Sequence, residues 1–288
     1  MLLAMLAIAC TGFEVPGATL VRWEEGGSGW YLPPRGDPSG AGVVMVHSVH
    51  PKMLVTRPLA EGLSRRGVAV LIVELPGFGS KADADPHGTG VSAVLDPGRA
   101  AADAVAARAV LLDQMGVPEA DRDRARVGVM GVSLGTFAAL AAGIDEPRYD
   151  PVLLVLGGGP AREVLLEGQR DAAFLRSRVL ATGISPAELA ERLDRTDPWH
   201  RVAGAPGLAE RVWAAYALKD RVFPNGTPVR LTEHIGVPEA QRMPLNANHY
   251  TAALAWPAVL DWAERAIKAS VDAGAATRPP DAAGPATR

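Results

Sequence analysis

The chain has 288 residues, of which 48% are hydrophobic and 21% charged, so it can bury a sizeable core in one large domain or two small ones. Its 29 basic and 32 acidic residues leave a formal net charge of −3. A chain without a basic excess lacks the charge that holds a nucleic-acid backbone. We therefore expect no nucleic-acid partner.

The cysteine and histidine content argues against metal and disulfide chemistry. A single cysteine, Cys10, excludes an internal disulfide and a cysteine-based zinc site. The six histidines show neither an HExxH motif nor another close metal-ligand spacing. We expect no structural metal.

The first ten residues, Met1–Cys10, form an uncharged apolar run about half as long as the roughly 20 residues that span a bilayer. The run resembles the end of a bacterial lipoprotein signal, in which apolar and small residues precede a lipidated cysteine. Ala7 stands where leucine is usual, and no Lys or Arg precedes the run, which a start codon upstream of Met1 would explain. We expect residues 1–10 to be a signal remnant, with lipid attachment at Cys10 of an exported, membrane-anchored bacterial protein. The alternative is a cytoplasmic protein whose N-terminal segment packs on the domain.

Short β-type runs begin after the apolar segment. Thr19–Trp23 and Gly29–Leu32 flank Glu24–Ser28, whose glycines favour a hairpin turn. Val43–Val46 and Val68–Val73 are continuous apolar runs, which are typical of strands buried on both faces of a parallel sheet.

Strand and helix patterns then alternate along the chain. The expected elements are a helix over Arg57–Arg66, a helix from Asp96-Pro97 to about Met115, a strand over Val127–Met130, a helix over Leu134–Ala142 and a strand over Val152–Leu156. This alternation predicts an α/β fold with a mostly parallel, doubly wound sheet.

The stretch from Gly157 to about Gly204 contains no strand pattern, and its Ser185–Glu188 segment fits a capping box. We interpret residues 158–204 as a small helical cap inserted over one edge of the sheet. The domain is completed by a strand over Val212–Ala217, a helix near Pro228–His234, a short strand over Gln241–Pro244 and a final helix from about Tyr250 to Ala269. We expect one α/β domain over residues 11–270, which includes this cap, and a disordered tail over 271–288.

Gly131-Val132-Ser133-Leu134-Gly135 has a GxSxG pattern between an expected strand and an expected helix. A strand that passes into a helix through one serine needs a strained turn, and glycines two residues to either side remove side chains that would clash there. Such a turn presents the hydroxyl at the carboxyl edge of the sheet and places Leu134 N–H at a helix N-terminus, where it can bind an oxyanion. The pattern predicts that Ser133 is a nucleophile; the alternative is a serine that caps an ordinary buried helix.

A serine nucleophile needs a general base that a carboxylate orients. In this architecture the acid and then the histidine follow the serine, on loops beyond the last strands. Asp220 comes just after the strand that ends near Ala217, and His249 lies after Gln241–Pro244, before the final helix. Both residues therefore stand where the chemistry requires them.

Over about Leu20–Ala269 the sequence resembles the α/β-hydrolase fold family, of serine esterase or lipase type. The segment ELPGFGS over Glu74–Ser80 is similar to the family's DxPGxGxS turn, with Glu74 in place of the usual aspartate. The segment VHSV over Val46–Val49 is similar to its HGx oxyanion loop, with Ser48 in place of a common glycine.

This resemblance implies that Ser133 is the nucleophile, Asp220 the acid and His249 the base. It also implies that the backbone N–H groups of Leu134 and Val49 bind the oxyanion. A serine at the elbow separates the chain from haloalkane dehalogenases and epoxide hydrolases, which use aspartate there, and from dienelactone hydrolases, which use cysteine.

Other candidates for the base and the acid fit less well. His47 and His50 flank the oxyanion loop and could line the pocket, but they precede Ser133 and break the expected order. Asp150 precedes its strand, and Asp197 belongs to the insertion.

The remaining histidines and three of the tryptophans have structural interpretations. His234 ends a helix, where a cation meets the helix dipole favourably. His200 is expected to be a cap or pocket residue, and Trp199, Trp213 and Trp256 are expected in the core or the pocket wall.

The sequence therefore predicts a serine hydrolase that cleaves a small-molecule ester through an acyl-enzyme, without a cofactor. The alternatives are a peptidase, thioesterase or perhydrolase with the same triad, or a non-catalytic binding protein that retains the fold. A membrane is expected as a partner only through the lipid on Cys10.

Overall fold

The computed structural model describes residues 15–48, 55–78, 91–95 and 97–276. Cys10, Val49 and His50 lie outside the described residues, as does the expected tail beyond residue 276. Export and lipid attachment therefore stay predictions. No helix in the described ranges is both long and apolar enough to cross a membrane.

The core of the described structure is an eight-stranded sheet with the order β1-β2-β4-β3-β5-β6-β7-β8. Strand β2 runs antiparallel to β1 and β4, and the remaining pairs are parallel. The mostly parallel, doubly wound α/β sheet that the sequence predicts is thereby confirmed. The strands are β1 (Thr19–Trp23), β2 (Gly27–Leu32), β3 (Gly42–Val46), β4 (Ala69–Val73), β5 (Val127–Val132), β6 (Tyr149–Val155), β7 (Val212–Ala217) and β8 (Arg242–Leu245).

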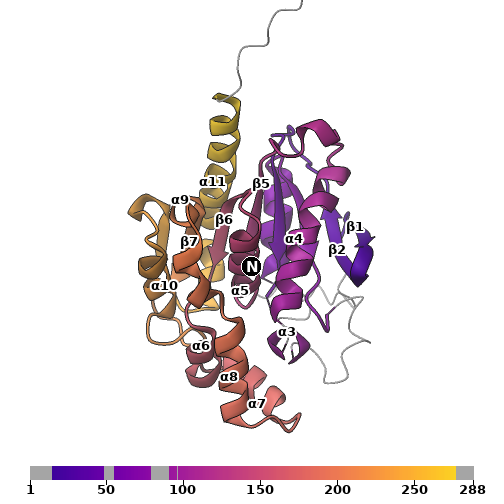
Figure 1. The fold of residues 1–288 in the computed structure, drawn as a ribbon. Helices are drawn as coiled ribbons and strands as arrows, with labels where there is room; N and C mark the ends of the chain where they lie inside the picture. The colour runs from indigo at the N-terminus through magenta and orange to yellow at the C-terminus, as the bar shows by residue number, and fades with distance from the viewer. Residues whose placement is uncertain (1–14, 49–54, 79–90, 96, 277–288) are drawn as a thin grey trace, which may run out of the picture.

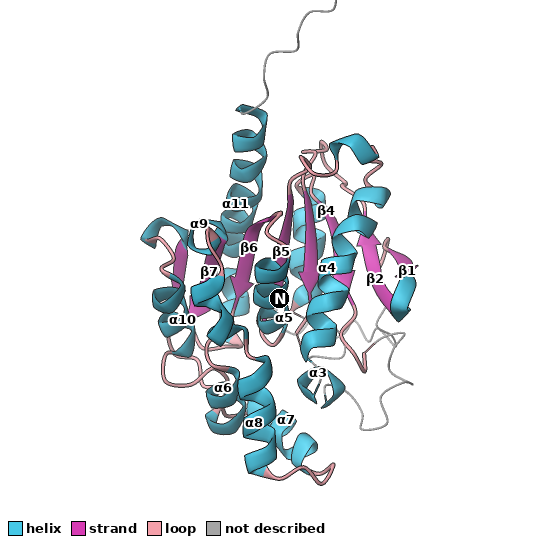
Figure 2. Cartoon of the chain, in the orientation of Figure 1, coloured by secondary structure: helices cyan, strands magenta, loops and turns pink. Residues whose placement is uncertain are grey.

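Helices lie on both sides of this sheet (Figures 1 and 2). The α-helices are α2 (Thr56–Arg65), α3 (Val91–Leu95), α4 (Pro97–Gln114), α5 (Gly135–Asp145), α6 (Ala161–Glu167), α7 (Asp171–Leu180), α8 (Pro186–Thr196), α9 (Leu208–Arg211), α10 (Thr227–Ile235) and α11 (Trp256–Ala276). Short 3₁₀ helices are η1 (Glu24–Gly26), η3 (Glu119–Asp121), η4 (Pro198–Gly204), η5 (Glu239–Gln241) and η6 (Thr251–Ala255).

Because successive side chains of a strand point to opposite faces of the sheet, β3 contributes side chains to the cores on both faces. Val44 and Val46 pack into a core with α4, α5 and α10, whereas Val43 and Met45 pack into a second core with α2 and α11. All four side chains are completely buried. A strand covered on both faces has to be apolar throughout, which is why its sequence shows a continuous run and no alternation.

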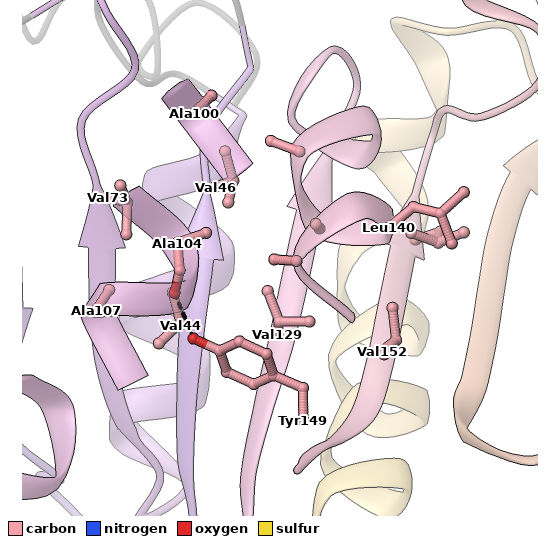
Figure 3. Close-up of a cluster of buried hydrophobic side chains, with 14 of the residues drawn as sticks. Val44, Val46, Val73, Ala100, Ala104, Ala107, Val129, Leu140, Tyr149 and Val152 are labelled. Carbon is pink, nitrogen blue, oxygen red and sulfur yellow. Dashed lines mark hydrogen bonds between the residues drawn. The ribbon is translucent and has the colours of Figure 1, made fainter. Parts of the chain in front are cut away.

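Tyr149, at the start of β6, is a large, completely buried side chain of the first core (Figure 3). Its hydroxyl donates a hydrogen bond to the backbone oxygen of Ala104 on α4, and its ring lies among valines and alanines. Burial raises the pKa of the Tyr149 phenol above its ordinary value of 10.0. This hydrogen bond joins α4 to the sheet across the core.

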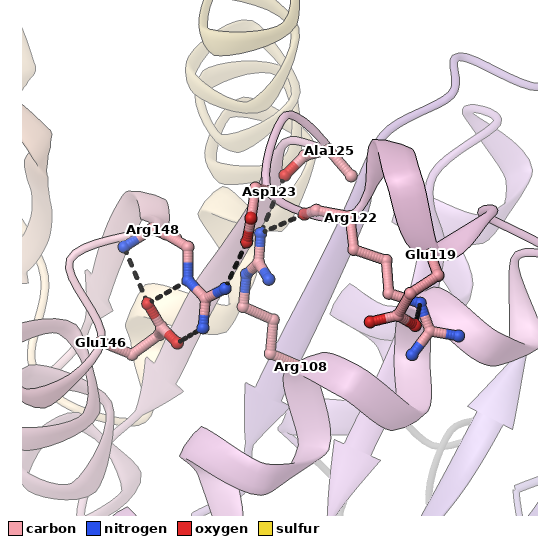
Figure 4. Close-up of polar contacts among 7 residues, drawn as sticks. All are labelled: Arg108, Glu119, Arg122, Asp123, Ala125, Glu146 and Arg148. Atoms are coloured by element: carbon pink, nitrogen blue, oxygen red, sulfur yellow. Dashed lines mark hydrogen bonds and ion pairs between the residues drawn. The ribbon is translucent and has the colours of Figure 1, made fainter.

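A polar cluster closes the end of the sheet at which β5 and β6 begin (Figure 4). Arg108 of α4 donates hydrogen bonds of 3.1 Å to the backbone oxygens of Arg122 and Ala125. Next to it, Arg148 binds Glu146 and Asp123, and the hydrogen bond from Arg148 lowers the pKa of Glu146. Because β5 follows directly, these bonds hold the connection from α4 to β5 in place.

Helices α6, α7 and α8 form the expected cap, beyond the carboxyl ends of β6 and β7 (Figure 1). Ser185 caps α8 by accepting a 3.1 Å hydrogen bond from Glu188 N–H, as the capping-box pattern predicts for that pair. Two features differ from expectation. Helix α11 continues to Ala276, through alanine-rich sequence that favours helix, rather than ending near Ala269. Helix α3 was not predicted, because its five residues are too few to show a helical period.

We expect Tyr149→Phe to lower the free energy of unfolding by about 1 kcal/mol at pH ~8, because one buried hydrogen bond is lost. Above pH ~10, Tyr149 ionises in the unfolded chain while it stays neutral in the folded protein. The free energy of unfolding of wild type therefore falls by up to about 1.4 kcal/mol per pH unit through this residue, and that of the variant does not. Urea denaturation at both pH values measures the two differences.

The other tyrosines are present in both proteins, so their titration cancels in the comparison. A difference between wild type and variant that stays constant from pH ~8 to ~11 would contradict a phenol held neutral by burial.

Candidate active site

Ser133 occupies the turn between β5 and α5 with a backbone φ of 54°. A non-glycine residue rarely adopts this left-handed conformation, which is strained. Two hydrogen bonds hold it: Ser133 N–H donates to Val155 O at 2.8 Å, and Thr136 N–H donates to Ser133 O at 3.0 Å. The strand therefore passes into the helix with the Ser133 side chain facing the carboxyl edge of the sheet.

The two flanking glycines are required by close backbone packing. A Cβ on Gly131 would lie 2.4 Å from Gly135 O, and a Cβ on Gly135 would lie 2.3 Å from Val46 O. Both contacts are with backbone atoms, which cannot move aside as a flexible side chain can. The GxSxG pattern therefore has glycine at these two positions because β5, α5 and the end of β3 pack too closely to leave room for a Cβ atom.

The fold brings together three residues that lie far apart in the sequence: Ser133, Asp220 and His249. Ser133 and His249 are 116 positions apart. Ser133 Oγ lies 3.1 Å from His249 Nε2, and His249 Nδ1 lies 2.7 Å from Asp220 Oδ2. The chain positions them on the loops after β5, β8 and β7 respectively. This is the relation of nucleophile, base and orienting carboxylate that serine chemistry needs.

The Asp220 carboxylate is fixed as an acceptor by its own loop. Its Oδ1 accepts hydrogen bonds from Val222 N–H at 2.8 Å and Phe223 N–H at 3.1 Å, which leaves Oδ2 for His249. The Asp220 side chain is only 2% exposed. The Phe223 ring stacks on the imidazole, with ring centroids 5.7 Å apart, so the histidine is held from two sides.

Of the two expected oxyanion donors, Leu134 and Val49, the structure describes only Leu134. Leu134 is the N-cap residue of α5, so its N–H lies at the positive end of that helix and next to Ser133. Val49, the second expected donor, is outside the described residues, and its role stays a prediction.

His47, which the sequence allows as a pocket residue or base, is completely buried and bound to backbone groups. Its Nε2 accepts a 3.0 Å hydrogen bond from Leu75 N–H, and its Nδ1 faces Ser48 O. A ring nitrogen that accepts a backbone N–H is unprotonated, so Nδ1 carries the hydrogen and donates it. His47 thus ties the loop after β3 to the loop after β4.

Glu74, the glutamate in place of the family's aspartate, is also a buried anchor. It accepts hydrogen bonds from Ser28 Oγ at 2.6 Å and Trp30 Nε1 at 2.9 Å. These bonds join the end of β4 to the antiparallel strand β2. Glu74 therefore supports the sheet edge of the site.

An apolar pocket of about 70 Å³ opens beside Ser133. Its walls come from α5 and the cap, and from the loop that carries Asp220. Most of the lining side chains are aliphatic or aromatic, among them Leu134, Phe137, Val164, Leu165, Leu175 and Phe223.

The alternative acids lie elsewhere in the structure. Asp197 accepts hydrogen bonds from Trp199 N–H and Ala161 N–H, so it caps η4 and α6; burial raises its pKa. It lines the apolar pocket but is bound to these backbone groups and not to His249. Asp150 is in β6 near its start, paired with Arg126 at 3.4 Å.

Among the described residues, His200, His234 and the three tryptophans make none of the contacts given for Ser133 and His249. The ring of His234 stacks on Trp199 at 4.2 Å, and His200 is exposed in η4. Trp213 contacts Trp262 edge to face, and Trp256 is buried in the core beneath α11. None of these lines the apolar pocket, so the expected core placement holds and the pocket-wall alternative does not.

A second hollow, of about 250 Å³, lies on the histidine side of the site. Arg170, Lys219 and Arg221 line it together with Val222, Asn248, His249 and Tyr250. We name it the cationic hollow. No sequence pattern marks these three basic residues as a group, because two of them follow β7 and the third belongs to the cap. Only the fold brings them together.

In the described part of the chain, no three His, Cys, Asp or Glu side chains gather as metal ligands do. The polar groups described at the site include those of the Ser133, His249 and Asp220 chain, the Leu134 N–H, the cationic hollow, and Asp171, Thr196 and Asp197 in the lining of the apolar pocket.

Solved structures with the same fold are similar to this chain at low sequence identity. TT1662 from Thermus thermophilus has a TM-score of 0.57 and 19% identity, covering 87% of this chain and 98% of its own. A cold-adapted esterase from an Arctic intertidal metagenomic library has a TM-score of 0.53 and 17% identity, covering 87% and 93%. A puromycin-hydrolysing peptidase from Mycobacterium tuberculosis has a TM-score of 0.59 and 15% identity. The match covers 87% of this chain but only 39% of the peptidase.

No curated protein matches the chain significantly by sequence. The Alpha/beta hydrolase family, in contrast, matches residues 43–283, which include β3 to α11 and all three members of the Ser133, His249 and Asp220 chain. This match covers well over half of the sequence, and it confirms the resemblance seen in the motifs. The chain belongs to the alpha/beta hydrolase family.

Proposed function

We propose that this protein is a serine hydrolase that cleaves a small-molecule ester through an acyl-enzyme on Ser133. The observation that carries the proposal is the continuous hydrogen-bonded chain from Ser133 Oγ to His249 to Asp220, with heavy-atom distances of 3.1 and 2.7 Å. A base within hydrogen-bond reach of the nucleophile, itself held by a carboxylate, is the arrangement that activates a hydroxyl at neutral pH.

In the acylation step, Ser133 Oγ attacks the ester carbonyl carbon while His249 Nε2 takes the hydroxyl proton. The tetrahedral intermediate collapses when the bond to the leaving oxygen breaks and His249 returns the proton to that oxygen. Water then repeats the sequence on the acyl-enzyme, with His249 as base and Ser133 as the leaving group. No cofactor takes part in these steps, and Asp220 stabilises the imidazolium that forms in each.

The negative charge on the carbonyl oxygen needs donors that are already in place. Leu134 N–H supplies one, aided by the positive end of α5, and Val49 is proposed as the second. Removal of one such donor typically lowers kcat by about 100- to 1000-fold, so the rigid turn at Ser133 contributes to catalysis as well as to nucleophile position.

The apolar pocket is proposed to hold the acyl group. Ser133 and Leu134 are at its edge, so an acyl chain bound there has its carbonyl next to the nucleophile. Its volume of about 70 Å³ is about half that of an engineered apolar cavity of ~150 Å³ that holds benzene. A short acyl chain therefore fits better than a long one.

The comparisons support a hydrolase without choosing its substrate, because similar structures include an esterase and a peptidase. A peptidase, a thioesterase, a perhydrolase and a non-catalytic binding protein are the alternatives. Purified protein assayed against p-nitrophenyl esters with and without hydrogen peroxide, and against the matching thioesters, amides and peptides, separates them. A protein inert to all of them would favour the binding role.

We expect Ser133→Ala to abolish ester hydrolysis and covalent labelling by a fluorophosphonate, because no other hydroxyl lies within reach of His249 Nε2 in the described contacts. The hydroxyl contributes little to packing, so the thermal transition is expected within a few degrees of wild type. Gel fluorescence and calorimetry measure the two properties; labelling that persists in the variant would move the nucleophile elsewhere.

We expect Asp220→Asn to lower kcat by about 10⁴-fold, as in the serine protease triad. The imidazole of His249 then loses the carboxylate that orients it and stabilises its protonated form. Steady-state rates of wild type and variant at one pH measure the difference.

The matched control is Asp150→Asn, which removes an acid that lies in β6 away from the site. An Asp220→Asn variant with more than about a tenth of wild-type activity would assign the orienting role to another acid, with Asp197 next in line.

We expect kcat/KM to be highest for esters with acyl chains of about two to four carbons and to fall with chain length, because the apolar pocket is small. Val164→Ala, which removes bulk from its wall, is expected to move the optimum to longer chains. A series of p-nitrophenyl esters of graded acyl length measures the profile; an optimum at long chains in wild type would contradict acyl binding in this pocket.

A further inference from the structure

The apolar pocket and the cationic hollow adjoin. Val222 lines both, while Ser133 lines the apolar pocket and His249 lines the cationic hollow. The hydrogen bond from Ser133 to His249 therefore lies between the two, with a mostly apolar lining that includes Asp171 and Asp197 on one side and three basic side chains on the other.

The chemistry of acyl transfer decides which part of a substrate enters which hollow. The general acid must lie within hydrogen-bond reach of the leaving oxygen to protonate it. The leaving group therefore lies on the side of His249, and the acyl group on the other. Because His249 lines the cationic hollow, the leaving group is directed there.

The three cations of the hollow have no carboxylate to neutralise them among the described ion pairs. None of the ion pairs given for the described residues involves Arg170, Lys219 or Arg221. The two carboxylates nearby are otherwise engaged. Asp220 is bound to His249, and Asp171 lines the apolar pocket and interacts with Tyr250.

Backbone hydrogen bonds tie together the segments that carry these cations. Gln169 N–H, next to Arg170, donates to Arg221 O at 2.8 Å, and Lys219 N–H donates to Ala247 O at 3.0 Å on the loop of His249. The Arg170 guanidinium lies over the Tyr250 ring, 5.3 Å from its centroid. The segments that carry the positive charge are therefore held next to His249, while Arg170, Lys219 and Arg221 remain exposed to solvent.

We propose that the cationic hollow recognises an anionic group, a carboxylate or a phosphate, on the leaving alcohol of the substrate. This inference rests on the proposed function, because it assigns the leaving-group side of that reaction. Arg170, Lys219 and Arg221 bind the anionic oxygens, and the ester oxygen lies at His249. After acylation the product that departs is an alcohol that carries the anion.

The test compares esters that share a butyryl group and differ in the leaving phenol. 4-Carboxyphenyl butyrate carries the anion, 4-carbamoylphenyl butyrate is its neutral counterpart, and an ester with a phosphonate at the same ring position separates phosphate from carboxylate. The carboxamide withdraws electrons more strongly than the carboxylate, so intrinsic reactivity favours the neutral ester. Rates are divided by those of hydroxide-catalysed hydrolysis.

We expect wild type to prefer an anionic ester by roughly tenfold in kcat/KM, since exposed charge pairs each contribute a factor of a few. Lys219→Gln and Arg221→Gln are each expected to lower this preference, the ratio of the rates on the anionic and neutral esters, by about threefold. The preference is also expected to fall as salt is raised to ~0.5 M, which shortens the screening length.

Arg195→Gln is the matched control. It removes the same charge from the cap, at a side chain paired with Glu191 and outside the cationic hollow. Its preference is expected to equal that of wild type. A control variant that loses the preference as fully as Arg221→Gln would assign the effect to net charge and overturn the proposal.

The outcomes separate this inference from the proposed function. Equal cleavage of anionic and neutral esters, with Ser133 labelled by the fluorophosphonate, overturns the inference and leaves the hydrolase intact. If no ester is cleaved and Ser133 is not labelled, the proposed function fails. Anion recognition by the cationic hollow is then tested by titration calorimetry of Ser133→Ala with the two esters. Several-fold tighter binding of the anionic ester supports this recognition, and equal binding overturns it.

Discussion

The turn between β5 and α5 holds Ser133 at a φ of 54°, and the rest of the site is arranged around that one strained residue. Such a conformation costs about 1–3 kcal/mol, which the surrounding structure has to offset. Here the hydrogen bond to Val155 O, the close approach of Gly135 to the end of β3 and the central place of β5 in the sheet all restrain it. The same geometry that strains the backbone brings the hydroxyl to His249 and Leu134 N–H to the helix end.

Several buried polar groups around this turn are held by backbone or side-chain partners. Asp220 accepts two backbone N–H bonds in addition to its bond with His249, and His47 and Glu74 anchor the loops after β3 and β4. A buried group whose hydrogen bonds are satisfied keeps one orientation, whereas an unpaired one would destabilise the fold. The proposed triad thus belongs to a larger fixed network that includes the sheet edge formed by β2.

The cap gives the site its two unlike sides. Helices α6 and α7 contribute aliphatic side chains to the apolar pocket, and the residue before α7, Arg170, contributes charge to the cationic hollow. Fold-level similarity to an esterase and a peptidase does not choose between their substrates, because one scaffold can carry many different sites. In the proposed function, substrate choice therefore depends on the inserted segment, on the loop that carries Asp220 and on the residues of α3, α4 and α5 that line the apolar pocket.

The sequence by itself determined the alternation of strands and helices, the elbow at Ser133 and the positions of Asp220 and His249 after their strands, because these features follow from local periods, glycine spacing and chain order. It missed α3, placed the end of α11 seven residues early and allowed His47 as a pocket residue. Only the tertiary structure decided that His47 binds Leu75 N–H and that Arg170 joins Lys219 and Arg221 beside His249. Those relations depend on how the cap and the loops pack across the edge of the sheet, between residues tens of positions apart, and no local pattern of residues encodes that packing.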